Sequence, residues 1–146
     1  MLFGMVLYGM LLGIPLSSCT RKNQQLESCV DSFAQSYFRW RFSKAMNSCD
    51  TASYRWLSFV ASQVTQADLN SLRDQKKDLT CSLGNTHFPN DSMAIVDVRV
   101  SNFLHMDSLG SVTFVEKETV YGIHATLHDG FWKVSLRKIP KPKKEG

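Results

Sequence analysis

The 146-residue sequence contains no motif that assigns a chemical reaction. Its four cysteines and four histidines do not have the spacing of a zinc site, and no histidine is placed to activate a cysteine nucleophile. Internal repeats and low-complexity tracts are also absent. We therefore predict no catalytic residue, no metal and no cofactor, and a non-enzymatic role is favoured over an enzymatic one.

Charge is absent from the first twenty residues, and the first charged side chain belongs to Arg21. Residues 2–16 form an apolar run that is too short for a comfortable transmembrane helix, which needs about 20 apolar residues. An apolar run of this length that ends in small residues is typical of a secretory signal, although the usual positive charge before the run is missing. The alternative is a buried helix or an uncleaved anchor.

The end of the apolar run, Leu16-Ser17-Ser18-Cys19, resembles the lipobox of bacterial lipoproteins. In that family the peptidase cuts before the cysteine, and the cysteine carries the acyl chains. The resemblance implies a signal peptide over residues 1–18, a lipidated Cys19 and a polar tether over residues 19–26. We expect a cell-envelope protein held by lipid on the periplasmic side of the outer membrane.

The remaining chain predicts one α+β domain over residues 27–139 and a basic tail over residues 140–146. Apolar residues at three- and four-residue spacing predict a helix from Leu26 to about Asn47. Asp50 or Thr51 caps a second helix through Ala61. A sequence that resembles a capping box, beginning at Thr65, opens a third helix that ends near Lys76.

After Asp78 the apolar period changes to two, which predicts four strands. They cover residues 79–83, 93–104, 111–127 and 131–139, with a loop over residues 84–91. Asp129-Gly130 is a hairpin signal between the last two strands. Helices followed by an antiparallel meander indicate an α+β fold.

Three cysteines remain if Cys19 is lipidated. A continuous helix would hold Cys29 and Cys49 on the order of 25 Å apart, since it rises about 1.5 Å per residue. A disulfide needs α-carbons within about 7 Å. Cys49–Cys81 is therefore the better pair, and the alternative is three buried free thiols.

The helical sequences Tyr37-Phe38-Arg39-Trp40-Arg41-Phe42, Trp56-Leu57-Ser58-Phe59 and Ala67-Asp68-Leu69 resemble those of small Bacteroidetes-type lipoproteins with a nuclear-transport-factor-2-like, or cystatin-like, domain. The Asp129–Val134 stretch is also typical of such domains. The resemblance implies that the first helix lies across a curved sheet and encloses a cone-shaped cavity. It supplies no catalytic residues.

Candidate residues for the lining of this cavity are mainly aromatic or charged: Tyr37, Trp40, Arg41, Tyr54, Trp56 and Asp97. Aromatic residues here are more often core than pocket. The strand alternation places Asp97 opposite the valines of its strand, and His124 opposite Tyr121, Ile123 and Ala125. We expect a module that binds a small ligand or an envelope protein. An isomerase or dehydratase in the cavity, and a structural protein that dimerises through its sheet, stay open as alternatives.

The basic tail contains Lys141, Lys143 and Lys144 between and after two prolines. Such a tail either contacts anionic lipid or nucleic acid or forms a solvated, disordered end, and the solvated end is favoured. No aromatic residue lies among these lysines as a base-stacking surface requires, so we expect no nucleic-acid partner.

Overall fold

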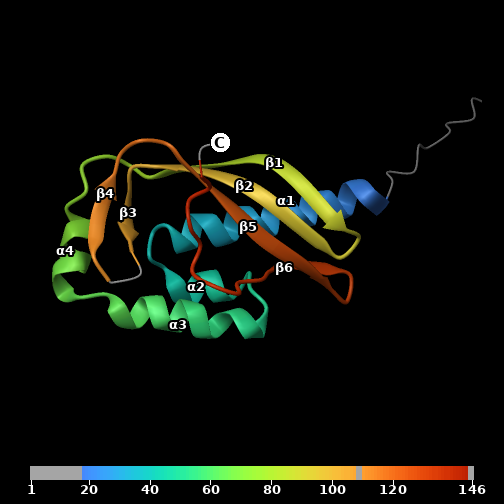
Figure 1. Ribbon diagram of the computed structural model, residues 1–146, viewed down its shortest axis with the longest axis horizontal. Coiled ribbons are helices and arrows are strands. Elements are labelled where there is room, and N and C mark those ends of the chain that lie inside the picture. The colour runs from blue at the N-terminus through green and yellow to red at the C-terminus, as the bar shows by residue number, and fades with distance from the viewer. Residues whose placement is uncertain (1–17, 108–109, 145–146) are drawn as a thin grey trace, which may run out of the picture.

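The computed structural model describes residues 18–107 and 110–144, with side chains from Arg21 onward. Helices come first along the chain and strands second, which confirms the α+β class (Figure 1). The helical part comprises α1 (Ser18–Tyr37), α2 (Phe42–Met46), the 3₁₀ turn η1 (Thr51–Ser53), α3 (Tyr54–Gln63) and α4 (Gln66–Arg73). The strands are β1 (Thr80–Asn90), β2 (Met93–Ser101), β3 (Phe103–Met106), β4 (Val112–Val115), β5 (Thr119–His128) and β6 (Phe131–Val134).

Four of the strands form one antiparallel sheet in the order β1-β2-β5-β6, and β3 pairs with β4 in a separate two-stranded sheet. The predicted strands over residues 93–104 and 111–127 are each divided. Asn102, with φ 57°, separates β2 from β3, and three charged residues at 116–118 separate β4 from β5. The β5–β6 hairpin turns at Asp129-Gly130, where both residues have positive φ, as the sequence predicts.

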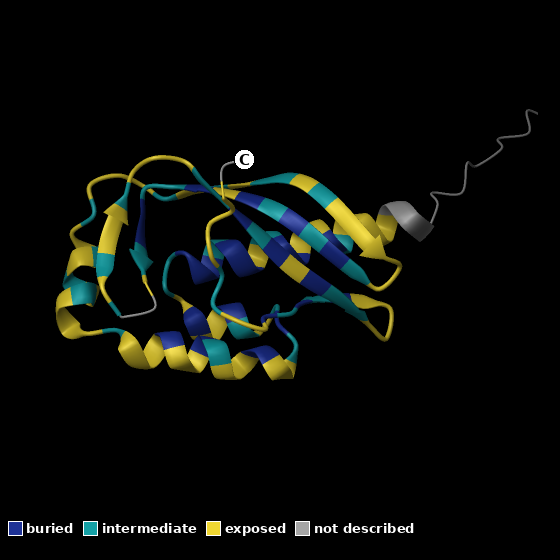
Figure 2. Cartoon of the chain, viewed as in Figure 1, coloured by how far each residue is buried: buried dark blue, intermediate teal, exposed yellow. Residues whose placement is uncertain are grey.

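The four-stranded sheet has two chemically different faces. Its inner face packs against α1 through buried side chains of β2 and β5, including Val96, Val98 and Ile123. Residues between them, such as Ile95 and Asp97, lie on the outer face. The alternation of buried and less buried residues along β2 is visible in Figure 2. The strand period therefore predicted the faces correctly.

The first helix ends ten residues earlier than predicted, because the chain reverses at Trp40. The Arg41 amide donates to the Ser36 carbonyl at 2.8 Å, and the Trp40 amide donates to the Tyr37 carbonyl at 3.0 Å. Trp40 itself is left-handed, with φ 60°. This pair of bonds is a Schellman motif, with a tryptophan at the position where glycine is usual. The short helix α2 then leads the chain back along α1.

The reversal overturns the expected separation of Cys29 and Cys49. The Cys29 thiol donates to the carbonyl of Ser48 at 3.3 Å, and Ser48 and Asp50 bond to the backbone of Val134 in β6. Cys49 thus lies beside Cys29, while Cys81 lies near Ala34 of α1. All three thiols are free, so the Cys49–Cys81 pair is absent from the structure.

Further boundaries differ from the sequence expectation, and the last strand ends at Val134 rather than at residue 139. Residues 19–26, expected as a tether, are the first turns of α1, and the side chain of Cys19 and the signal residues 1–17 lie outside the described residues. The expected loop over residues 84–91 is mostly strand, because β1 continues through two irregularities in its pairing with β2. The basic tail folds back onto the sheet as far as Lys143.

Candidate functional site

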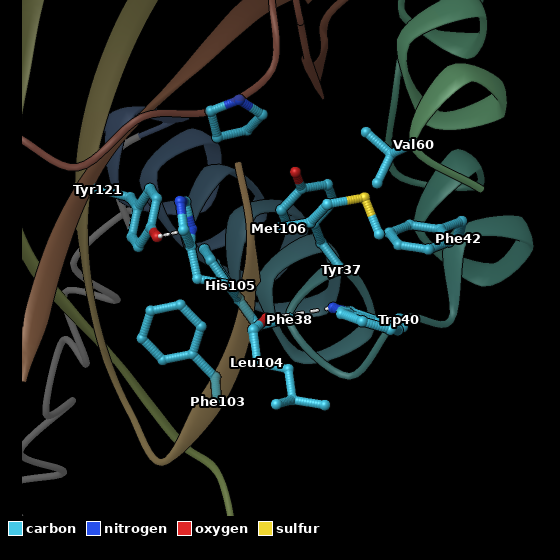
Figure 3. A pocket seen from close by; sticks show the side chains of 11 residues that line it. Tyr37, Phe38, Trp40, Phe42, Val60, Phe103, Leu104, His105, Met106 and Tyr121 are labelled. Atoms are coloured by element: carbon cyan, nitrogen blue, oxygen red, sulfur yellow. Dashed lines mark hydrogen bonds between the residues drawn. The ribbon is translucent and has the colours of Figure 1, made fainter. Parts of the chain in front are cut away.

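The space between the helices and the inner face of the sheet is almost filled by side chains. The cavity that remains measures about 20 Å³, which is room for about one water molecule. Eleven residues line it, and ten of them are labelled in Figure 3. They are mainly aromatic and aliphatic, and none is a carboxylate: Tyr37, Phe38, Trp40, Phe42, Val60, Phe103, Leu104, His105, Met106, Tyr121 and Pro140.

Three polar side chains around this cavity, those of Tyr121, His105 and Trp40, form hydrogen bonds. The Tyr121 hydroxyl lies 3.2 Å from Nδ1 of His105, and the Trp40 indole donates to the Leu104 carbonyl at 3.2 Å (Figure 3). Burial raises the pKa of Tyr37 and of Tyr121, so both phenols are neutral at physiological pH. A base and a donor that converge on a substrate-sized space are not found among these residues.

The six predicted pocket residues are not brought together. Tyr37 and Trp40 line the small interior cavity, whereas the side chains of Arg41 and Tyr54 are exposed. Trp56 is partly buried, with the guanidinium of Arg55 5.2 Å from its ring centroid. Asp97 lies on the outer face of the sheet, where its carboxylate pairs with Lys143. The aromatic cluster is therefore mainly core.

A larger space lies on the other side of the sheet, which we call the outer groove. It measures about 970 Å³ and is bounded by the outer face of β1, β2 and β5 and by the C-terminal segment 135–143. Known ligand pockets measure about 300–1,000 Å³. Apolar side chains of the groove come from both the sheet and the segment: Met93, Ile95, Leu136, Ile139, Pro140 and Pro142.

The C-terminal segment is fixed at both ends of this groove. At its start, the Leu136 amide donates to the Ser53 hydroxyl at 2.7 Å. Near its end, the Lys143 amide donates to the Val120 carbonyl at 2.7 Å, and the Lys143 ammonium lies 2.9 Å from the Asp97 carboxylate. Figure 1 shows this segment returning from β6 to the beginning of β5. The segment is thus a wall of the groove.

Gly122 lies beneath this wall, on the outer face of β5. A β-carbon there would be 3.4 Å from Cγ2 of Ile95 and 3.8 Å from Cδ of Lys143. A larger side chain would therefore project into the space between the sheet and the segment. The glycine keeps the groove open and lets the Lys143 stem cross the strand.

Positive charge predominates in the outer groove. Four lining residues are cationic, Arg137, Lys138, Lys141 and Lys143, against one carboxylate, Asp97. Lys143 neutralises Asp97. Within the residues that the structure describes, no carboxylate pairs with Arg137, Lys138 or Lys141. The groove therefore presents an uncompensated positive charge.

Two histidines lie in one row across the groove floor. His87 of β1 and His124 of β5 both face Ile95 of β2 in the pairing register. Partial burial lowers the pKa of His124, and the positive charges of Arg137 and Lys138 lower it further. His124 is therefore mainly neutral at pH 7.

The outer groove was not predicted from the sequence. The strand period places Asp97 and His124 on the outer face, but it does not show that the C-terminal segment covers part of that face. The signal that was available is the run Arg137-Lys138-Ile139-Pro140-Lys141, which mixes cations with apolar residues. An isoleucine is not expected in a solvated tail, and Ile139 packs against the core.

No protein-family model matches the sequence, and no curated protein is significantly similar to it. Among the helices of the described part of the chain, none has the length and apolar character to cross a membrane. The same residues contain no group of three or more histidine, cysteine or acidic side chains arranged to hold a metal ion.

Proposed function

We propose that this protein is a lipid-anchored, non-enzymatic module of the bacterial cell envelope, and that it binds a small ligand in the outer groove. The observation that carries the ligand proposal is the contrast between the two spaces. The interior cavity has room for about one water, whereas the outer groove has the volume of a ligand pocket. An apolar floor and a wall fixed by hydrogen bonds complete the groove.

The anchor proposal depends on the lipobox-like sequence that ends at Cys19. Because α1 begins at Ser18, the acylated cysteine would join the folded domain without a flexible tether. From Arg21 onward, the first buried residue of α1 is Leu26, which comes seven residues after Cys19, or about 10 Å along a helix. The domain would therefore stand close to the lipid surface, on the periplasmic side of the outer membrane.

The cystatin-like family also stays a proposal. It is supported by helices that precede an antiparallel sheet and by the packing of α1 on one face of that sheet. The enzymatic alternative has less support, because the residues that line the interior cavity include no carboxylate base. Dimerisation through the sheet has less support as well, because the C-terminal segment covers part of the outer face.

The anchor is tested by metabolic labelling with palmitate in a bacterium that processes lipoproteins. Wild-type protein should carry the label, and Cys19→Ala should not. Cys81→Ala is the matched control, because it removes a cysteine outside the lipobox and should stay labelled. Label on Cys19→Ala, or none on the wild type, would refute the anchor.

The ligand site is tested by titrating the full chain in zwitterionic lipid nanodiscs with eight-carbon amphiphiles, with empty discs subtracted. We expect saturable binding of one molecule per chain. Gly122→Leu should abolish it by filling the groove, whereas Ser58→Leu, which adds the same side chain on the exposed surface of α3, should bind as the wild type does. Binding that survives Gly122→Leu would contradict the proposed site.

A further inference from the structure

The charges around the outer groove are arranged for a particular kind of ligand. Its apolar floor, formed by Met93 and Ile95, continues into Ile139 on the wall. Arg137 and Lys138 come directly before Ile139 in the same wall, and both side chains are exposed. An apolar surface is therefore joined to a cationic one within a single space.

We propose that the outer groove binds an anionic amphiphile, a molecule that joins a carboxylate, sulfonate or phosphate to an apolar body. This inference rests on the proposed ligand site and adds the chemical class of its occupant. The apolar body lies over Ile95 and Ile139, and the anionic group meets Arg137 and Lys138. A guanidinium offers paired donors that match the oxygens of such anions, and a nearby ammonium adds charge.

Charge complementarity selects an anion over a cation or a neutral molecule. Among the described residues that line the groove, Asp97 is the one carboxylate, and its pairing with Lys143 removes its attraction for a ligand cation. A cationic amphiphile would meet repulsion from Arg137, Lys138 and Lys141. A neutral amphiphile would gain the apolar contact but leave these charges unpaired.

Binding of the anionic amphiphile is coupled to protonation of the His124 ring. On the outer face, Ile95 is opposite His124 and His87 lies beyond Ile95, while the Asp97–Lys143 pair lies beside Gly122, two residues along β5. Arg137 and Lys138 act on His124 from the C-terminal segment. A bound anion offsets the two cations that lower its pKa, so the pKa of His124 rises on binding and the ring takes up a proton. By linkage, binding strengthens as pH falls, by at most about tenfold per pH unit for one proton.

The test uses three probes that share an eight-carbon chain: octanesulfonate, octyl glucoside and octyltrimethylammonium. Each is titrated calorimetrically into the full chain in zwitterionic nanodiscs, with empty discs subtracted. We expect octanesulfonate to bind most tightly and to weaken as salt increases. Arg137→Gln and Lys138→Gln should each weaken octanesulfonate binding about threefold to tenfold and leave octyl glucoside unchanged. Lys44→Gln, which removes an exposed charge from α2, is the matched control.

The outcomes separate this inference from the proposed function. Equal binding of the three probes, all lost in Gly122→Leu, would retain the ligand site and overturn the anion preference. Absence of binding by every probe would overturn both. Competition by an anionic phospholipid placed in the disc would support the same chemistry and identify the bilayer as the source of the ligand, whereas a lack of competition would identify a free molecule.

The pH dependence supplies a second, independent readout. Octanesulfonate stays ionised between pH 8 and pH 6, so any change in its affinity over this range comes from the protein. Affinity should rise as pH falls in the wild type, and His124→Gln should flatten the profile. His128→Gln, at the end of β5, should keep the wild-type slope. A flat wild-type profile would refute the coupling to His124.

Discussion

Ser53 fixes the start of the groove wall, and its loss should destabilise the protein measurably. The Ser53 side chain is fully buried, and its hydroxyl accepts the Leu136 amide at 2.7 Å while donating to Asp50. In Ser53→Ala the Leu136 amide, in a residue that is 7% exposed, loses its acceptor without gaining access to water. A buried donor left unpaired costs about 1–3 kcal/mol. We expect Ser53→Ala to lower the free energy of unfolding by that amount.

Urea denaturation followed by tryptophan fluorescence measures this loss. With a typical slope of about 2 kcal/mol per molar urea, the midpoint should fall by about 0.5–1.5 M. Ser58→Ala is the matched control, because Ser58 is exposed on α3 and alanine favours a helix. Amide hydrogen exchange at Leu136 should also quicken in Ser53→Ala. The reasoning is refuted if Ser53→Ala and Ser58→Ala have unfolding free energies within about 0.5 kcal/mol of each other.

Two further predictions concern the helix reversal and the thiols. At Trp40, glycine should be more stable than alanine by about 1 kcal/mol, because only glycine adopts positive φ without strain. Both variants should be less stable than the wild type, since each loses the bond to Leu104. At Ser58 in α3, the alanine variant should instead be more stable than the glycine variant. If urea denaturation gives the same stability order at Trp40 and at Ser58, the Schellman motif at Trp40 is contradicted. Burial raises the pKa of Cys81 to about 11 and of Cys49 to about 12, so alkylation at pH 8 should be slow until the chain unfolds. If an oxidant forms a disulfide, mass spectrometry should find Cys29–Cys49; a Cys49–Cys81 bridge would contradict the observed chain path.

Local signals in the sequence predicted many features of the fold correctly. The Asp50 carboxylate accepts the Ser53 amide at 3.0 Å, as a cap at that position requires. Thr65 and Asp68 exchange the two bonds of a capping box. The valines of β2 are buried on one face, and the Asp129-Gly130 turn closes the last hairpin. Each of these features depends on residues within four positions of one another or on the strand period.

The reversal at Trp40 could not be predicted in the same way. Tryptophan rarely occupies a left-handed position, and the apolar spacing continues through Phe42 and Ala45 as it would in one helix. The structure offsets the backbone strain by the bond from the indole to Leu104, which is 64 residues away. Because that partner belongs to a strand, the helix end is a tertiary property.

The candidate site also combines features that the sequence predicts with features that depend on tertiary contacts. The outward direction of Asp97 and His124 follows from the strand period, whereas the interior cavity suggested by the family resemblance is almost filled by aromatic side chains. How far side chains fill a space depends on distances between elements, which sequence spacing does not specify. The outer groove likewise requires the C-terminal segment to return to the sheet through Lys143, Val120 and Asp97.

The sequence by itself determined the α+β class, the caps of the later helices and the two faces of the sheet, because each depends on neighbouring residues and on a fixed period. Tertiary structure alone decided where α1 ends, which cysteines lie together and which face of the sheet carries a groove. Those features depend on contacts between residues far apart in the chain, such as Trp40 with Leu104 and Ser53 with Leu136.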